Sequence, residues 1–295
     1  MSLEAYPDTI SKFCLTGGEC MLLGKDVDRI LSYAKGKGLK CSMVSNAFWA
    51  TDYDKATAIL KRLKRNGLRM ASFSTGEDHN KHVPWMNVRN ASVAAARLGL
   101  ESELRIEDQP GRMEIFKAID KDEEITALVS EGKLKISRSS WMHYNNKGRK
   151  ARNWKVDFYD TGKRERCTSL FSDIIINPYG EMYACCGIGV CHIPQMRLGN
   201  VNTEPVKDIY ERAFDDFLKA WLFTDGPQEI LKYVHGKTGQ KFNCHTMHHC
   251  DICRVIFTDR TIIPLIRDNF FDAADLPLIS YKAISKKENE ERGGR

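Results

Sequence analysis

Apolar positions in the first half of the chain follow two alternating patterns. Short apolar runs are each followed by a stretch in which apolar residues recur at intervals of three or four, the spacing of one helix face. Glycine or proline separates most of these segments, as is typical of helix ends and turns. We therefore expect strands at residues 12–16, 40–44, 69–73 and 103–106, and helices within 27–34, 56–63 and 84–98.

Strands that alternate with helices at this pace favour parallel pairing with right-handed crossovers. The rhythm weakens over residues 113–129 and changes after the basic stretch 146–152. The sequence thus predicts an α/β domain over residues 1–160, an α/β barrel or open sheet, and a smaller α+β domain over residues 161–284. Residues 285–295 are polar and charged, and we expect a disordered tail there.

The second part opens with a hairpin pattern. Two strand-like runs, residues 171–176 and 181–184, flank Asn177-Pro178-Tyr179-Gly180, in which Pro and Gly supply the turn geometry. Further on, apolar residues at helical spacing follow Pro205 from Val206 to Ala220 and predict one continuous helix.

The composition is that of a folded, water-soluble protein. Of the 295 residues, 42% are hydrophobic and 28% are charged, and no apolar run approaches the roughly 20 residues needed to span a bilayer. The start of the chain lacks an export signal, so we expect a cytoplasmic protein without a membrane partner. The net charge of +6 is mild, and basic residues gather near residues 61–69 without interleaved aromatics, which argues against nucleic-acid binding.

Cysteine is the residue type whose distribution points to chemistry. Seven of the ten cysteines lie after residue 166, and without an export signal metal binding is favoured over disulfides. Two thiolates near the predicted hairpin and two on a later C-x-x-C turn can converge on a 4Fe-4S cluster or a tetrahedral zinc ion. Spacing does not choose between them, and His245, His248 and His249 are alternative ligands. The candidate metal ligands are Cys167, Cys185, Cys186, Cys191, Cys244, Cys250 and Cys253, with Cys186 as an alternate.

A second candidate site lies at the expected carboxyl ends of the first three strands. In parallel α/β folds these ends share one mouth, where ligands bind. Two glycines let a ligand approach the backbone, and Glu19 offers a carboxylate to a cationic group such as the ammonium of an amino acid. His79 and His82 follow the third strand; each is expected to be a loop or packing residue rather than a ligand contact. The candidate binding residues are Gly17, Gly18, Glu19, Ser45, Asn46 and Ser74.

These strand ends resemble those of the radical S-adenosylmethionine (SAM) family. Leu15-Thr16-Gly17-Gly18-Glu19-Cys20 is similar to that family's Gly-Gly-Glu motif, with Cys20 in place of the usual Pro. Ser45-Asn46 and Ser72-Phe73-Ser74 resemble the ends of the next two strands. The resemblance implies that the six candidate binding residues line a SAM site in a partial (β/α) barrel.

The chain departs from that family in one respect. Radical SAM enzymes bind their catalytic 4Fe-4S cluster with a C-x-x-x-C-x-x-C loop after the first strand, and these 295 residues contain no such triplet. The 13 residues before Cys14 are too few for a β/α unit, which needs about 30. We therefore expect that the first β/α unit is missing and that the strand at residues 12–16 has an unprotected edge. The alternatives are a truncated and inactive gene product, an internal start, and a protein that has lost the radical step.

The cysteine-rich part resembles a SPASM or twitch domain. Cys167 is followed by Gly180 and then Cys185 at that domain's opening spacing, whereas the later cysteines depart from the usual order. The resemblance favours an auxiliary 4Fe-4S cluster over zinc. It also implies reductive cleavage of SAM and hydrogen abstraction from a substrate, for which a peptide or protein is expected, with an electron-donor protein as partner. The competing hypotheses are a non-enzymatic iron-sulfur electron-transfer or binding protein and a zinc-stabilised module.

Overall fold

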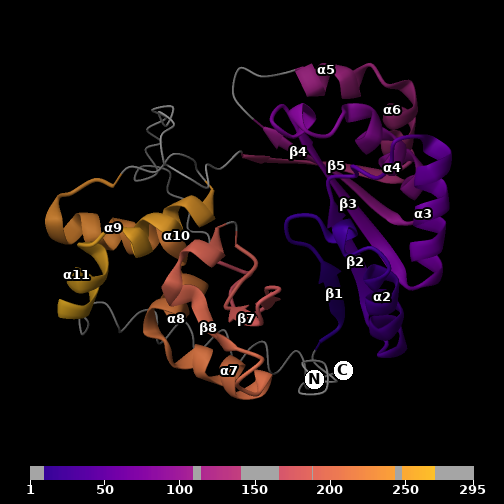
Figure 1. Cartoon of the computed structure of the whole chain (residues 1–295). Helices are drawn as coiled ribbons and strands as arrows, with labels where there is room; N and C mark the ends of the chain where they lie inside the picture. Colours follow the sequence, from indigo (N-terminus) through magenta and orange to yellow (C-terminus); the bar gives the residue numbers. More distant parts are fainter. Residues whose placement is uncertain (1–9, 109–113, 141–165, 188, 243–247, 270–295) are drawn as a thin grey trace, which may run out of the picture. The chain divides into compact units, whose positions relative to one another are not determined.

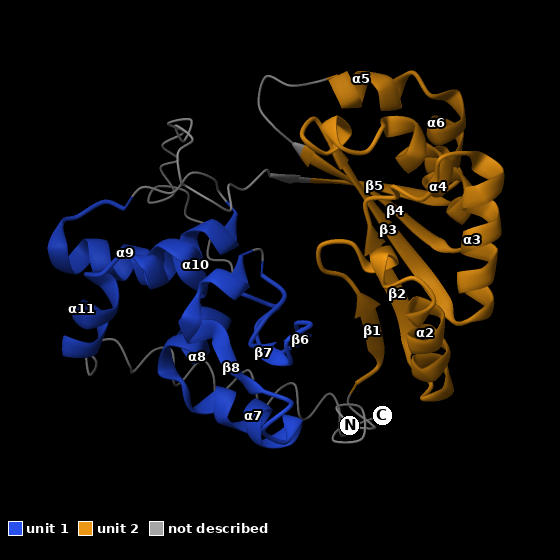
Figure 2. Cartoon of the chain, in the orientation of Figure 1, with its two compact units in different colours: residues 1–5, 142–295 blue, residues 6–141 orange. Residues whose placement is uncertain are grey.

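The computed structural model describes residues 10–108, 114–140, 166–187, 189–242 and 248–269. The chain divides into two compact units, which Figure 2 colours separately: unit 2 covers Tyr6–Trp141, and unit 1 covers Met1–Ala5 with Met142–Arg295. Each unit has its own hydrophobic core. Within the described residues, no helix combines the length and the apolar character that crossing a membrane requires.

Unit 2 is built on a five-stranded sheet whose strands are all parallel and lie in the order of the sequence. The predicted parallel α/β architecture is confirmed; barrel closure stays a prediction. The strands are β1 (Lys12–Leu15), β2 (Lys40–Ser45), β3 (Leu68–Gly76), β4 (Glu101–Asp108) and β5 (Leu134–Ser140). Between them lie η1 (Cys20–Leu23), α2 (Asp26–Gly36), α3 (Tyr53–Arg65), η2 (His79–Lys81), α4 (Trp85–Arg97), α5 (Glu114–Asp120) and α6 (Glu123–Ser130).

The two faces of this sheet differ in polarity. Phe73 pairs with Leu104 and Leu104 with Ile136, and these apolar residues belong to the core that the helices cover, as Figure 1 shows for α2, α3 and α4. The neighbouring positions face the other way, because side chains alternate along a strand. That second face is polar, since it carries Ser72, Ser74, Glu103, Arg105, Glu107 and Ser137.

Helix boundaries in unit 2 follow local capping chemistry. Asp52 accepts a hydrogen bond from the backbone N–H of Lys55 and begins α3, and Asp122 does the same for Ile125 at the start of α6. Pro84 lies just before α4, as the sequence predicts. Residues 114–130, where the sequence pattern is weak, contain the two short helices α5 and α6.

Unit 1 combines a small antiparallel sheet with five α-helices among its described residues. The predicted hairpin is confirmed, and the sheet order is β6-β7-β8. Its elements are β6 (Ile175–Ile176), β7 (Glu181–Tyr183), η3 (Val190–His192), η4 (Pro194–Met196), β8 (Arg197–Asn200), α7 (Val206–Arg212), η5 (Ala213–Asp215), α8 (Phe217–Thr224), α9 (Gly226–Thr238), α10 (His249–Thr258) and α11 (Ile262–Asp268).

The prediction of one continuous helix from Val206 to Ala220 is wrong. The chain leaves the helical conformation at Asp216, whose carboxylate accepts a hydrogen bond of 3.0 Å from the backbone N–H of Lys219. Aspartate competes in this way with helix continuation and favours a new N-cap. The apolar spacing continues across the break because α7 and α8 both contribute to buried clusters.

Candidate functional site

Five cysteines from three separate segments line one cavity in unit 1, and four of them are Cys167, Cys185, Cys250 and Cys253. The backbone N–H of Cys167 donates to the carbonyl of Leu222 at 3.2 Å. Cys185 follows shortly after β7, and Cys250 and Cys253 lie on α10. The cavity has a volume of about 680 Å³ and is lined by all four thiols. The cysteines of the predicted hairpin and of the predicted C-x-x-C turn are therefore brought together.

The backbone at Gly187 leaves room between two of these sulfurs. A side-chain Cβ at this position would lie 3.2 Å from Sγ of Cys185 and 3.3 Å from Sγ of Cys250. Such contacts are tighter than ordinary packing, so glycine is the residue that fits here. The Gly187 N–H also donates to Sγ of Cys185 at 3.4 Å. A pocket of thiols with a backbone donor aimed at sulfur fits the needs of an iron-sulfur cluster.

The start of α10 fixes the other pair of thiols. The ring Nδ1 of His248 accepts a hydrogen bond of 3.2 Å from the backbone N–H of Cys250 and caps the helix. Cys250 and Cys253 are three residues apart and therefore share one helix face. The positive end of the helix dipole lies at this first turn, where it favours thiolate over thiol.

Burial opposes that effect in the metal-free chain. It raises the pKa of Cys185 from 9.0 to about 12, and the neighbouring Cys167 and Cys250 add to the shift because negative charges in one cavity repel. Burial likewise raises the pKa of Cys167 and, more strongly, that of Cys253. These thiols thus hold their protons at neutral pH, and metal binding must release them.

The metal-free protein should lose stability in alkaline solution. In the unfolded chain these thiols titrate near pH 9.0, whereas the folded chain holds the protons to higher pH. The stabilising contribution is complete below about pH 9 and falls as pH rises towards about 12. Thermal unfolding of the metal-free protein at about pH 8 and about pH 10 measures this loss, and Cys185→Ala should make it smaller. Equal pH dependence in both proteins would contradict the assignment.

The remaining candidate ligands do not join the four thiols. Cys186 lines the same cavity, but its Sγ donates to Oδ2 of Asp173 at 3.3 Å. Cys191 lies beside the hydroxyl of Tyr183, which also donates to Glu181. Cys244 and His245 lie outside the described residues. His248 and His249 also line the cavity. Within the described residues, no three or more His, Cys, Asp or Glu side chains, the four thiols included, are arranged to hold a single metal ion.

In unit 2 the carboxylate of Glu19 ties the ends of β1 and β2 together. It accepts hydrogen bonds from the backbone N–H groups of Met21 at 2.9 Å and Asn46 at 2.8 Å, and from Oγ of Ser45 at 2.9 Å. Gly17 has φ of +120°, a conformation that side chains rarely adopt. Five of the six predicted binding residues therefore meet at one place, with Glu19 as the link.

Ser45 supports this link from the core side. It is only 2% exposed, and its Oγ accepts hydrogen bonds from the indole of Trp49 at 2.9 Å and the N–H of Ala47 at 3.0 Å. Ser45 thus holds Glu19 in position and does not face solvent. Ser74, the sixth predicted residue, lies on the polar face of β3.

Ser45→Ala should destabilise unit 2 by about 2–4 kcal/mol, because two buried N–H donors would lose their acceptor. Chemical denaturation with a far-ultraviolet signal measures the change. Ser74→Ala is the matched control, since the Ser74 hydroxyl makes no hydrogen bond to the described part of the chain and should cost far less. Similar losses for both variants would contradict the assigned role of Ser45.

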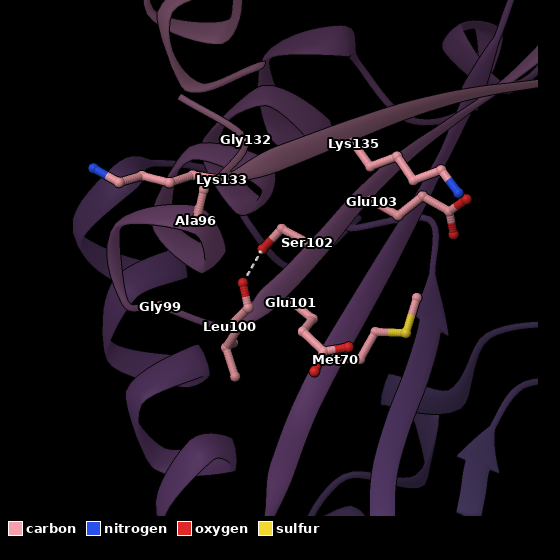
Figure 3. A pocket seen from close by; sticks show the side chains of 10 residues that line it. All are labelled: Met70, Ala96, Gly99, Leu100, Glu101, Ser102, Glu103, Gly132, Lys133 and Lys135. Atoms are coloured by element: carbon pink, nitrogen blue, oxygen red, sulfur yellow. Dashed lines mark hydrogen bonds between the residues drawn. The ribbon is translucent and has the colours of Figure 1, made fainter. Parts of the chain in front are cut away.

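Unit 2 also contains a cavity of about 390 Å³ at the amino ends of β3, β4 and β5 (Figure 3). Met70, Glu103 and Lys135 line it, and within it Oγ of Ser102 donates to the Leu100 carbonyl at 2.9 Å. The amino ends of parallel strands serve stability in barrel-like folds, whereas ligands bind at the carboxyl ends. This cavity is therefore not the candidate site.

Comparison with known proteins shows what the part of the chain that holds the four thiols is similar to. No curated protein matches the chain. Residues 167–254 match the SPASM family, described as an iron-sulfur cluster-binding domain, and this range contains Cys167, Cys185, Cys250 and Cys253. Residues 167–254 of the chain are thus similar to the SPASM iron-sulfur cluster-binding domain.

Proposed function

We propose that the SPASM domain binds one 4Fe-4S cluster through Cys167, Cys185, Cys250 and Cys253. The observation that carries this proposal is the meeting of these four thiols, from three segments of the matched domain, around one cavity. Cys186, which lines the same cavity, is the alternate ligand. When bound, a 4Fe-4S cluster supplies one-electron transfer.

We further propose that unit 2 binds SAM at the carboxyl ends of β1, β2 and β3. Oε1 of Glu19 accepts hydrogen bonds from Met21, Ser45 and, at 3.8 Å, the thiol of Cys20, whereas Oε2 accepts only one, from the N–H of Asn46. A carboxylate oxygen has about two acceptor positions, so Oε2 can accept a further hydrogen bond from an ammonium group. A Cβ at Gly17 or Gly18 would have no described atom within 4 Å beyond the adjacent residues, which leaves the backbone there open to a ligand. The proposed reaction class is reductive SAM cleavage followed by hydrogen abstraction from a peptide substrate. The electron for that cleavage would come from the catalytic 4Fe-4S cluster, whose C-x-x-x-C-x-x-C motif is not among these 295 residues, so for this chain the proposal is SAM binding.

Anaerobic reconstitution tests the first proposal. Iron, sulfide and zinc are quantified per chain, and the visible absorption spectrum is recorded. About four irons with matching sulfide and a broad band near 400 nm are expected for one cluster. One zinc per chain without iron would contradict it and favour a zinc-stabilised module.

Equilibrium dialysis with SAM tests the second proposal. Glu19→Gln should weaken binding about tenfold, because it removes the negative charge that faces the ammonium group. Lys61→Ala, a change on the exposed face of α3, is the control and should leave binding unchanged. Equal affinity in wild type and Glu19→Gln would remove support for the site.

A second candidate function is an iron-sulfur electron-transfer or binding protein. It is favoured by the sequence, because the 295 residues contain no C-x-x-x-C-x-x-C motif to bind the catalytic cluster of a radical SAM enzyme. The same two experiments separate the candidates: a bound cluster together with SAM affinity at background supports this one.

A further inference from the structure

A histidine and a glutamate form a pair at the carboxyl edge of the unit 2 sheet. Nδ1 of His79, on η2 directly after β3, lies 3.0 Å from Oε2 of Glu107, near the end of β4. The side chains are 36% and 23% exposed, so solvent and ligands can reach both. Neither residue takes part in the Glu19 network at β1 and β2.

The strand geometry brings this pair close together. Gly76 pairs with Glu107 across β3 and β4, and a Cβ at residue 76 would lie 2.8 Å from Cβ of Glu107 and 3.0 Å from its carbonyl oxygen. Glycine thus permits the approach that places η2 over the end of β4. The arrangement is built by the backbone rather than by side chains that meet at the surface.

Glu107 determines what the other ring nitrogen can do. With Nδ1 donating to the carboxylate, neutral His79 presents Nε2 as an acceptor, and the carboxylate makes that nitrogen more basic. No described residue makes a hydrogen bond to Nε2. The charges that face the ring are Glu107 and Asp78, and Lys81 forms an ion pair with Asp78. A neutral ring in negative surroundings suits a cation that carries hydrogen-bond donors.

We propose that His79 binds the primary ammonium group of a ligand through Nε2, and that Glu107, which accepts the hydrogen bond from Nδ1, keeps Nε2 as the acceptor and supplies negative charge nearby. A peptide amino terminus or a lysine side chain has this chemistry. The inference rests on the proposed function only in naming the reaction's substrate class. The ammonium site itself requires neither SAM nor the cluster.

The protonation state of His79 determines how ammonium binding should change with pH. Hydrogen bonding to Glu107 raises the pKa of His79, with the charge of Asp78 adding to the shift. A protonated ring cannot accept a hydrogen bond from an ammonium group and repels it. Ammonium binding should therefore strengthen as pH rises through the His79 titration, and bound ammonium should lower the pKa of His79.

The experiment uses the full chain with ¹⁵N-labelled histidine rings, observed by NMR across the pH range of imidazole titration. His79→Gln assigns the His79 signals among the eight histidines, and exposed His82 serves as an internal control. The probes are ethylammonium chloride and tetramethylammonium chloride, two cations of which only the first has N–H donors. Glu107→Gln keeps a hydrogen-bond acceptor for Nδ1 while removing the charge.

Ethylammonium should shift the Nε2 signal of His79 and lower its titration midpoint, with no effect on His82. Tetramethylammonium should do neither, and Glu107→Gln should weaken ethylammonium binding about tenfold. Equal responses to both cations, equal responses at His79 and His82, or no response at either end of the pH range would overturn the proposal. SAM dialysis and iron content remain independent readouts, so failure here leaves the proposed function standing.

Discussion

Cys185→Ser is expected to remove most of the iron that the reconstituted protein binds. Serine replaces a soft sulfur ligand with a hard hydroxyl, which iron-sulfur clusters bind poorly. Changes next to metal ligands already cost 10- to 100-fold in affinity, so losing a ligand should cost more than about 100-fold. Iron content after gel filtration and the absorbance near 400 nm measure the effect. Cys253→Ser should give the same result.

Cys186→Ser is the matched control for this prediction. It changes the next residue in the chain and a thiol of the same cavity, but one that donates to Asp173. Its iron content should stay close to that of the wild type. If Cys186→Ser lost as much iron as Cys185→Ser, the four-thiol assignment would be wrong and Cys186 would be a ligand.

Phe73→Ala should destabilise unit 2 by about 3–5 kcal/mol, the usual cost of removing a buried aromatic ring. Phe73 is fully buried, and its ring packs edge-on against Trp49 with centroids 6.3 Å apart. The truncation leaves a cavity between the sheet and its helices. Differential scanning calorimetry measures the shift, and the transition that moves should be that of unit 2.

The iron content of Phe73→Ala separates the two units in the same experiment. The thiols belong to unit 1, whose core contains no residue of unit 2. The variant should therefore bind as much iron as the wild type in conditions where unit 2 remains folded. A large loss of iron would contradict independent folding of unit 1.

The regular part of the fold follows from the sequence because local signals agree there. The predicted strand at 12–16 is β1 to within one residue. The helix expected within 56–63 is α3 (Tyr53–Arg65), which begins after the Asp52 cap and ends at its basic last turn. The sequence does not predict the strand β5 (Leu134–Ser140), since its apolar positions are few and Lys135 and Arg138 interrupt them. Pairing with β4 places it in the sheet, and such pairing is not encoded locally.

In the candidate sites, too, local motifs could be predicted from the sequence, whereas contacts between distant residues could not. Convergence of a hairpin cysteine with a C-x-x-C turn could be predicted, because both motifs are local and metal ligation needs four donors. Cys186 is already set apart as an alternate in the sequence analysis, whereas the separation of Cys191 could not be predicted, since it depends on the neighbouring Tyr183. The sequence around His79 indicates only a loop or packing residue, and its contact with Glu107 spans 28 positions of sequence. Only the register of β3 and β4 brings them together.

The spread of the four thiols along the chain also dictates a sequence of events during synthesis. Cys250 follows Cys185 by 65 positions, which a ribosome translating ~5–20 residues per second covers in roughly 3–13 s. During that interval Cys167 and Cys185 have been synthesised but α10, the helix that completes their site, has not. All residues of unit 2 up to Trp141 have already been synthesised. Cluster insertion must therefore wait for α10, and the two early thiols are open to oxidation before then.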